Sequence, residues 1–421
     1  MRIAVVGSGV AGLTAAWLLR QRHDVWLYEQ NDYVGGHANT ATMTFGQKKL
    51  PVDTAFVIFN NDTYPIFSRL LDYLGVESRE TATSFSCNAN DSGIAYFYGR
   101  GRFLVRRSDW LKPALYRMVL DTLRFFRRTS VLRGNGHSET GITIEAFLRR
   151  EGYSRHFIDN VLLPQAAALW SLPMAACREL DSHAFVAGFR EARFLSVGNR
   201  HHWRTIVGGS REYVNRLLAQ LHGRIRLRTG VCSIRRREDA VAVRDSSGSE
   251  DVFDHVILAS HADQSLRMLT DASDVERAVL GRFTYYPNTV VLHHDPDLMP
   301  ALQAHWATWN YFAADDTADA HRPVAHTYWM NRLQGIDQRL PTFVSLNPLR
   351  RPHDHLIEQS LRYEHPTLDA ATVRAQQELS LIQGTNRTWF CGACYERGGS
   401  HEDALRTGLH VARSFGVDLP W

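Results

Sequence analysis

The sequence has little cysteine, little excess charge and no long apolar run, and each shortage excludes a class of protein. An odd number of scattered cysteines forms no disulfide framework and predicts a reducing compartment, by default the cytoplasm. The net charge of +4 is too near neutrality for a chain-wide nucleic-acid-binding surface, so no nucleic-acid partner is expected. No apolar run reaches the ~18 residues of a transmembrane span.

Metal motifs and a secretory signal are also missing. The 20 histidines include no HExxH pattern, and no paired CxxC motifs occur, so no metal site is expected. The apolar residues 3–19 resemble a signal peptide, but glycines interrupt them and no small-residue cleavage site follows. With 44% hydrophobic and 22% charged residues, the 421-residue chain has the composition of a globular protein of two or three folding units.

The first twenty residues carry a strand, a glycine-rich turn and a helix, in that order. Apolar character predicts a short buried strand over 2–6 and a helix over 11–20. Between them, Gly7 allows a tight turn, Gly9 lets a pyrophosphate approach the backbone, and Gly12 lets helix and strand pack closely. With Val10 and Ala11, these glycines open the helix, whose N-terminal N–H groups and dipole favour an anion.

An acidic residue follows at the spacing that a dinucleotide requires. Glu29 ends a second predicted strand, over 24–28, and stands 22 residues after Gly7. A carboxylate there can accept both ribose hydroxyls of an adenosine, with Gln30 beside it. A lone glycine fingerprint is weak, but strand, glycines, helix, strand and acid in register predict an adenine dinucleotide site.

A second glycine pair follows the acid, at Gly35 and Gly36, with His37 after it. This spacing resembles the Glu-x5-Gly-Gly-Arg pattern of flavin amine oxidases, protoporphyrinogen oxidases and phytoene desaturases. The resemblance implies FAD as the cofactor, with this loop passing its pyrophosphate and ribityl chain. His37 stands where the pattern has arginine.

Later segments complete an α/β fold. Strands are predicted over 224–234, 240–244, 253–259 and 388–393, and a helix over 404–415. The N-terminus of that last helix is suited to face the flavin ring and to stabilise negative charge near N1. We therefore expect a Rossmann-like FAD-binding domain of the flavin amine oxidase type over 1–70, 200–270 and 385–421, and a second α+β substrate domain over 71–199 and 271–384.

Through many further motifs, the chain resembles one bacterial family. Its members are FAD-binding amine-oxidase-like proteins that accompany cyclopropane-fatty-acyl-phospholipid synthase-type methyltransferases. The chain is also similar to the related flavin domain of plant cyclopropane fatty acid synthases. The motifs are VDTAF at 52–56, FN at 59–60, TYP at 63–65, LP at 163–164, ALWS at 168–171, WR at 203–204, VGGS at 207–210, WATWNY at 306–311, TYWMNRLQ at 327–334, SLNP at 345–348, QG at 383–384 and HED at 401–403. The resemblance covers essentially the whole chain.

This resemblance implies an FAD-dependent oxidoreductase acting on modified acyl chains, and a lipid methyltransferase as a partner. Hydride would pass between a phospholipid-borne methyl-branched, cyclopropane or unsaturated acyl chain and flavin N5. The flavin contacts that it implies, besides the two glycine motifs, are Thr54, Ala55, Phe56, Trp203, Val231, Ala259, Gly392, Ala393, His401, Glu402, Asp403 and Ala404.

Residues for proton transfer are harder to identify. Tyr328, His401 and Glu402 are the candidates for a catalytic acid or base, and each also has a structural interpretation. Two other functions stay open. One is a flavin amine oxidase or protoporphyrinogen-oxidase-like enzyme acting on a small molecule, and the other is a non-catalytic FAD-binding partner of a lipid methyltransferase.

Residues 99–134 carry ten Lys or Arg against two Asp. A helix here would have arginines 117, 124 and 128 on one side and a broad apolar arc on the other. The arc comprises Leu111, Ala114, Leu115, Met118, Val119, Thr122, Phe125 and Phe126. This pattern fits a helix lying on an anionic membrane surface, on the inner face of the cytoplasmic membrane, or a core helix with a solvated basic edge.

Three other patterns in the sequence allow more than one interpretation. Cys391 and Cys394 have CxxC spacing, but their apolar strand context favours buried side chains over a redox pair. Buried amides need partners, so at least one of Asn310, Asn331 and Asn347 is expected to face substrate or flavin. Two interpretations are open for a set of aromatic residues, which either line an acyl tunnel or belong to an ordinary core. The set is Trp170, Trp306, Trp309, Tyr311, Tyr328 and Trp329.

Overall fold

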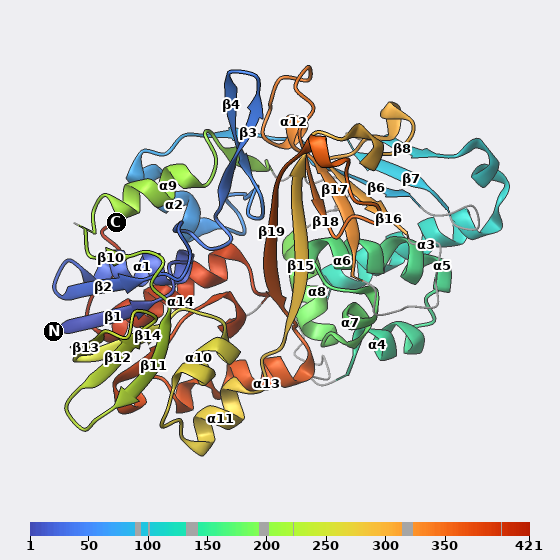
Figure 1. Cartoon of the computed structure of the whole chain (residues 1–421). Helices are drawn as coiled ribbons and strands as arrows, with labels where there is room; N and C mark the ends of the chain where they lie inside the picture. The colour runs from blue at the N-terminus through green and yellow to red at the C-terminus, as the bar shows by residue number, and fades with distance from the viewer. Residues whose placement is uncertain are drawn as a thin grey trace.

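The computed structural model describes residues 1–88, 94–99, 102–131, 142–192, 202–221, 223–313, 323–396 and 398–421, and only the backbone of 129–131 and 190–192. Two sheets organise the chain (Figure 1). A parallel sheet and its helices form one side of the molecule, and a larger, mixed sheet backed by helices forms the other. The long strands β15 and β19 lie between them.

The parallel sheet has the strand order β10-β2-β1-β14-β20. Its strands are β1 (Arg2–Val6), β2 (Asp24–Tyr28), β10 (Ile225–Arg226), β14 (His255–Leu258) and β20 (Thr388–Phe390). Side chains of β1 and β14 are buried on both faces, as expected for central parallel strands. The sheet therefore joins three segments that are far apart in the sequence.

Three predicted strands differ in extent from those in the structure. The strand predicted over 388–393 ends at Phe390, and a 3-10 helix follows from Ala393. The strand predicted over 224–234 is divided, because the chain turns at Arg228, whose φ is 52°, and resumes as β11 (Val231–Arg236). The strand predicted over 253–259 begins at His255, because Phe253 ends β13 (Glu250–Phe253). Strand β13 pairs with β12 (Val241–Asp245) in an antiparallel three-stranded sheet, β11-β12-β13.

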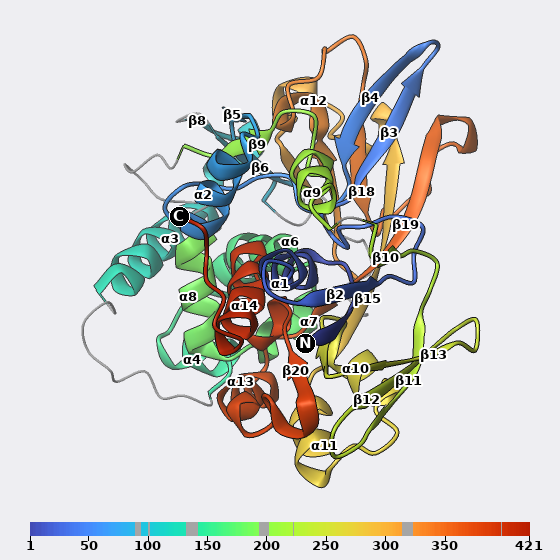
Figure 2. The same ribbon diagram turned by 90° about the vertical axis from the view of Figure 1, so that its left-hand side faces the viewer.

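Each face of the parallel sheet is covered. Helices α1 (Val10–Leu19) and α14 (His401–Ser414) pack together on one face (Figure 2), where a Cβ on Gly408 would lie 2.4 Å from the carbonyl oxygen of Ala11. All ten residues of α1 are buried, which explains its uniformly apolar sequence. On the other face, apolar side chains of β11 to β13 pack with Ala4, Val6 and Val256.

The mixed sheet has the order β19-β15-β18-β17-β16-β6-β7-β8, and its neighbouring strands are antiparallel except for β16 and β6. The strands are β6 (Ser84–Asn88), β7 (Tyr96–Gly99), β8 (Arg102–Val105), β15 (Tyr285–His293), β16 (Trp309–Phe312), β17 (Ala325–Trp329), β18 (Phe343–Leu346) and β19 (Ile357–Pro366). Its inner face packs on a helical layer in the largest apolar cluster. That layer contains α3 (Pro113–Val131), α4 (Ile144–Arg150), α5 (Arg155–Phe157), α6 (Leu163–Trp170), α7 (Met174–Glu179) and α8 (Ser182–Ala192).

Shorter elements connect these layers. Two strand pairs are β3 (Thr40–Phe45) with β4 (Lys48–Asp53), and β5 (Ser78–Glu80) with β9 (Arg204–Ile206). The remaining α-helices are α2 (Pro65–Leu74), α9 (Arg211–Leu218), α10 (Ala262–Met268), α11 (Asp274–Leu280), α12 (Met330–Leu333) and α13 (Ala370–Glu378). The helix predicted over 404–415 begins three residues earlier, at His401, because Ser400 and Asp403 form a capping box.

Candidate functional site

The three glycines of the first turn have different surroundings. A Cβ on Gly7 would lie 2.7 Å from the carbonyl oxygen of Ala259, and one on Gly12 would lie 2.0 Å from the carbonyl oxygen of Gly7. These two glycines allow β1, β14 and α1 to approach closely. A Cβ on Gly9 would meet nothing within 4 Å. Gly9 therefore leaves open space at the N-terminus of α1, beside Val10 and Ala11, where a phosphate can approach the backbone.

Glu29 is buried beside this turn. One carboxylate oxygen accepts hydrogen bonds from the Ser8 amide, at 3.0 Å, and the Ser8 hydroxyl, at 2.5 Å. The other accepts from the Asn31 amide at 2.8 Å. The carbonyl oxygen of Glu29 accepts from Thr229, so the segment before Val231 lies against Glu29 and Gln30. The structure thus brings together residues that the sequence analysis assigned to the adenosine end of the cofactor.

The second glycine pair packs directly on the first. The Gly35 amide donates to the carbonyl oxygen of Ser8 at 3.0 Å, and a Cβ on Gly36 would lie 3.1 Å from Cα of Gly9. The next residues run beside the segment that contains Thr54, Ala55 and Phe56. The Phe56 amide donates to the carbonyl oxygen of His37 at 3.1 Å. Two predicted cofactor segments therefore lie side by side.

His37 connects this loop to strand β19. Its ring centroid lies 4.9 Å from that of Tyr363 and 5.1 Å from that of His365, and its Nε2 has no hydrogen-bond partner. Burial, followed by the nearby His261, lowers the pKa of His37 to about 4. The imidazole is therefore neutral at pH 7, and His37 does not supply the fixed positive charge of the arginine that it replaces.

Tyr363 and His365 belong to the site, and sequence reasoning missed them. The Tyr363 hydroxyl lies 2.7 Å from Oγ1 of Thr54 and accepts from the Asn39 amide group at 3.0 Å. His365 Nδ1 lies 3.0 Å from Nδ2 of Asn288. The alternation of Tyr363 and His365 along one strand face was visible in the sequence, but only the fold places that face against the glycine loop.

The C-terminal residues reach the same region. Gly392 donates its amide hydrogen to Oγ1 of Thr407 at 2.9 Å, and Ala393 follows in a 3-10 turn. His401, the first residue of α14, stacks on Phe56 and lies 3.0 Å through Nε2 from the Tyr213 hydroxyl. Burial, then His37, lowers the pKa of His401 to about 3, so this ring is also neutral at pH 7. The next residues, Asp403 and Ala404, are buried in the first turn of α14.

Glu402 has a structural contact that argues against proton transfer. Its two carboxylate oxygens accept the amides of Ile66, at 2.9 Å, and Phe67, at 3.0 Å. These amides belong to the first turn of α2 and have no partner within that helix. Glu402 therefore caps α2 from another helix, and we do not retain it as a catalytic candidate. Trp203 lies just before β9, where its carbonyl oxygen accepts from the Thr81 amide at 2.8 Å.

Three predicted site residues are only partly buried. His37, His401 and Tyr328 each keep part of their surface accessible. Nevertheless, burial lowers the pKa values of the two histidines strongly and raises the pKa of Tyr328 to about 12. All three side chains are therefore neutral at pH 7.

The inner face of the mixed sheet carries apolar and aromatic side chains. On β6 and β15 to β19, the described inward residues include no Asp, Glu, Lys or Arg. They are Phe85, Cys87, Tyr286, Asn288, Val290, Leu292, Trp309, Tyr311, His326, Tyr328, Val344, Leu346, Gln359, Leu361, Tyr363 and His365. His326, 1% exposed, has no hydrogen-bond partner at either ring nitrogen, and burial lowers its pKa to about 3.

The predicted aromatic set is divided between the two faces of this sheet. Trp170, Trp309, Tyr311 and Tyr328 belong to the inner cluster, whereas Trp306 and Trp329 pack with Met299 and Phe343 in a separate cluster. Because residues alternate between faces along a strand, Tyr328 and Trp329 cannot line the same tunnel wall.

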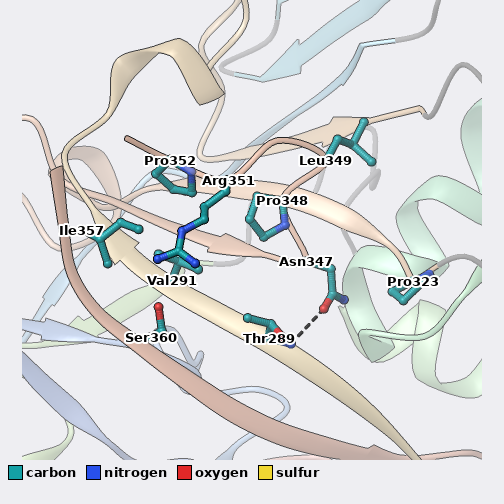
Figure 3. Close-up of a pocket in the computed structure, with 10 residues that line it drawn as sticks. All are labelled: Thr289, Val291, Pro323, Asn347, Pro348, Leu349, Arg351, Pro352, Ile357 and Ser360. Carbon is teal, nitrogen blue, oxygen red and sulfur yellow. Dashed lines mark hydrogen bonds between the residues drawn. The ribbon is translucent and has the colours of Figure 1, made fainter. Parts of the chain in front are cut away.

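The asparagine prediction is wrong for all three residues. Asn310 accepts from the Ala307 amide and donates to the carbonyl oxygen of Thr327, and Asn331 bonds the backbone of Asp337, Leu340 and Thr342. Asn347, at the edge of a surface pocket of about 400 Å³, accepts from the Thr289 amide at 2.8 Å (Figure 3). All three amides have protein partners, and this pocket opens on the outer face of the sheet, away from His37.

The cysteine prediction is confirmed, since Cys391 and Cys394 are buried and unbridged. Burial raises the pKa of Cys391, and it raises the pKa of Cys394 to about 12, so neither is a thiolate at pH 7. Among the described residues, no group of three or more His, Cys, Asp and Glu side chains is placed to hold a metal ion.

Comparison with known proteins agrees with this geometry. Residues 10–298 match the family model described as flavin containing amine oxidoreductase. A comparison with curated protein sequences gave no match.

Solved structures of the same fold include a CLA-producing fatty acid isomerase from P. acnes, with a TM-score of 0.68, 15% identity and coverage of 98% of each chain. Putrescine oxidase bound to putrescine has a TM-score of 0.69, 14% identity and 99% coverage of each chain. Cyclohexylamine oxidase from Brevibacterium oxydans IH-35A has a TM-score of 0.69, 13% identity and 98% coverage of each chain. At these identities the likeness establishes the fold alone.

Proposed function

The chain belongs to the family of flavin-containing amine oxidoreductases, and on this premise we propose that its substrate is an apolar acyl chain rather than an amine. The family implies FAD, and the residues present fit it. Gly9 leaves space for a pyrophosphate, Glu29 is positioned for a ribose, and the buried Nε2 of His37 has no hydrogen-bond partner. When bound, FAD exchanges a hydride with the substrate at N5.

The observation that carries the proposal is the uncharged inner face of the mixed sheet. A protonated amine or diamine buried beside the flavin would need a carboxylate or a comparable partner, because an unpaired buried charge is costly. The described inward residues of β6 and β15 to β19 offer none. An alkyl chain needs no such partner and gains free energy from contact with Trp309, Tyr311 and Leu346.

His326 stays neutral within this face. Its low pKa keeps the imidazole uncharged at pH 7, with one nitrogen as a donor and the other as an acceptor. Leaving both without partners costs about 1–3 kcal/mol for each buried group. His326 therefore adds no charge that could attract or repel a substrate.

The direction of hydride transfer determines whether a proton must be removed from the substrate or donated to it. In oxidation, a hydride leaves one acyl carbon, a proton leaves its neighbour and a carbon–carbon double bond forms; reduction is the reverse. Tyr328 lies 4.6 Å from His326 between ring centroids and keeps part of its surface accessible. With its pKa raised to about 12, Tyr328 holds its proton at neutral pH and can donate it to a carbon in the reductive direction.

The proposal includes the source of the substrate. Methyl-branched and cyclopropane chains arise by methyl transfer to an unsaturated acyl chain, so a lipid methyltransferase is the class of enzyme that would supply them. The same enzyme is the protein partner that we propose. Co-purification of the chain with such a methyltransferase, each carrying a different affinity tag, tests this part separately.

The test is an anaerobic titration of the FAD-loaded protein, followed by the flavin absorption band. The titrants are phospholipids that carry methyl-branched, cyclopropane or unsaturated acyl chains, presented both as vesicles and as detergent-dispersed lipid, with putrescine and cyclohexylamine as controls. The dithionite-reduced protein is titrated in the same way. Bleaching by acyl chains alone, or reoxidation of the reduced flavin by them, supports the proposal.

Bleaching by an amine, with no response to lipids, would overturn the proposal in favour of an amine oxidase. An unchanged flavin with every titrant, in both redox states, would favour the non-catalytic FAD-binding partner instead.

A further inference from the structure

Strand β8, a short 3-10 helix (Arg107–Leu111) and α3 lie at one end of the molecule (Figure 1). These elements carry many exposed apolar side chains. Seventeen large apolar side chains in the described part of the chain are a third or more exposed. Eight of them lie between residues 103 and 123, a concentration that scattered surface residues do not produce. They are Phe103, Leu104, Trp110, Leu111, Tyr116, Val119, Leu120 and Leu123, and together they define the α3 surface.

The α3 surface is not the apolar arc that the sequence predicted. Leu115, Met118 and Phe125 of that arc are buried in the core, whereas Leu111 and Val119 are exposed, Leu111 by 88%. The predicted arc was correct for the core side of α3 and wrong at its edges. A second apolar stripe, with Leu120 and Leu123, lies on the solvent side, and nothing in the described part of the chain covers it.

Basic residues border this stripe. Tyr116, Leu120 and Leu123 are spaced by four and three residues, so they share one side of α3. Arg117 and Arg124 each follow one of these by a single position, which places them on the adjacent side. Between residues 102 and 128 the chain has eight Lys or Arg and two Asp, a net charge of +6.

Acidic side chains neutralise only part of this charge. Asp109 and Asp121 are buried, and each is paired with basic side chains of the same segment. Asp109 contacts Arg106 and Lys112, and Asp121 contacts Arg117. Glu151 pairs with Arg128. With these three acids counted, the segment still has a positive net charge.

We propose that the α3 surface docks the protein on an anionic phospholipid bilayer. Apolar side chains flanked by arginines, with a tryptophan and a tyrosine among them, match the apolar interior, the anionic headgroups and the interfacial region of a membrane. No helix in the described part of the chain is both long and apolar enough to cross a bilayer. The protein binds through this face, with α3 lying along the membrane plane.

A protein partner explains the surface less well. The centre of a protein interface is depleted in charged groups, whereas arginines here run the length of the stripe. The inference goes beyond the proposed function and does not rest on it. It adds a route by which the enzyme reaches phospholipid-borne chains from the membrane surface.

The test is co-sedimentation of the full-length, FAD-loaded protein with vesicles. We compare vesicles of phosphatidylglycerol and phosphatidylcholine with vesicles of phosphatidylcholine alone. The expected result is binding at least about tenfold stronger to the anionic vesicles, weakening as salt is raised. The double variant Leu120→Ser/Leu123→Ser should lose binding by about tenfold or more.

Two controls separate this surface from general effects. Leu302→Ser/Leu381→Ser removes two leucines of similar exposure elsewhere, 63% and 62%, and should bind as the parent protein does. Trp110→Phe should remove most of the fluorescence quenching caused by brominated lipids, because Trp110 is half exposed within the α3 surface.

Equal binding of both double variants, or equal binding to both kinds of vesicle, would overturn the proposal. A change in sedimentation velocity of Leu120→Ser/Leu123→Ser without vesicles would overturn it in favour of a protein interface. None of these measurements uses turnover. A protein that bleaches with dispersed acyl chains but does not bind vesicles therefore refutes docking alone, and one that binds without bleaching refutes the proposed function alone.

Discussion

The imidazole of His401 lies flat against the ring of Phe56, with ring centroids 3.7 Å apart and ring planes inclined by 9°. Phe56 belongs to the segment after β4, and its amide bonds the carbonyl oxygen of His37. Tyr213 of α9 completes the contact through its hydroxyl. The stack therefore holds the N-terminus of α14 against the loop that follows the second glycine pair, where the flavin ring is expected.

This stack predicts that His401 supports FAD binding through its shape. His401→Ala should weaken FAD binding about tenfold, equivalent to about 1.4 kcal/mol, because Phe56 and the His37 loop lose their packing partner. His401→Phe should restore most of the affinity, since a neutral ring replaces a neutral ring. Fluorescence titration of the apoprotein with FAD measures both. Weak binding by His401→Phe would instead assign the role to the imidazole nitrogens, and His410→Ala, on an exposed position of the same helix, is the control.

The first turn predicts opposite results for two glycine variants. Gly9→Ala should leave the melting temperature of the apoprotein within about 2 °C, because its Cβ meets no protein atom and its φ of −61° suits alanine. It should weaken FAD binding about 100-fold or more, because the methyl group occupies the pyrophosphate space. Gly12→Ala should lower the melting temperature itself, since its Cβ would lie 2.0 Å from the carbonyl oxygen of Gly7. Thermal melts and FAD titrations of both apoproteins test the pair; normal FAD binding by Gly9→Ala would contradict the assigned site.

Glu402 should matter for stability and not for chemistry. Glu402→Gln keeps one good acceptor for the amides of Ile66 and Phe67 and should cost about 1–2 kcal/mol of unfolding free energy. The rate of flavin reduction by an active substrate should change by less than about twofold, because Glu402 faces α2. Denaturant unfolding and stopped-flow reduction measure the two effects. A reduction rate lower by 100-fold with normal stability would return Glu402 to the catalytic candidates.

Buried histidines should make the fold sensitive to acid. The pKa of His326 is lowered by burial to about 3 in the folded protein, against about 6.5 in the unfolded chain, so the unfolded state binds more protons between these values. Stability from this group is complete above pH 6.5 and is lost as pH falls below it, by up to about 2–3 kcal/mol at pH 4.5. His37 and His401 act with the same sign.

Comparison of wild type with His326→Phe isolates this contribution. Asp53 has the opposite sign, because burial raises its pKa to about 7 and its folded form keeps a proton that the unfolded chain has lost. The variant leaves Asp53 unchanged, so unfolding free energies at pH 7.5 and 5 should fall less steeply for His326→Phe than for wild type. An equal decrease in unfolding free energy from pH 7.5 to pH 5 in both proteins would mean that His326 has an ordinary pKa and a hydrogen-bond partner.

The nucleotide end of the site could be predicted from the sequence because its determinants are local. The sequence alone shows the apolar periods of strand and helix, the glycines of the tight turn and the spacing of the acid. Strands β1 and β2 and helix α1 lie where these patterns predict them. Glu29, the three glycines of the first turn and the pair Gly35–Gly36 then meet, because parallel strands bring their carboxyl ends to one edge of a sheet.

The substrate end was decided by tertiary contacts. The pairing of β15 with β19 brings His365 beside Asn288, and the packing of β19 on the glycine loop brings Tyr363 to Thr54. Because side chains alternate along a strand, Tyr328 and Trp329 lie on opposite faces of the sheet, but the alternation does not show which face is buried. In the same way, a helical wheel for α3 does not show which of its two apolar sides packs on the core. Local spacing therefore determined that an adenine dinucleotide binds, whereas burial, set by segments hundreds of residues apart, decided which side chains lie inside and which face the solvent.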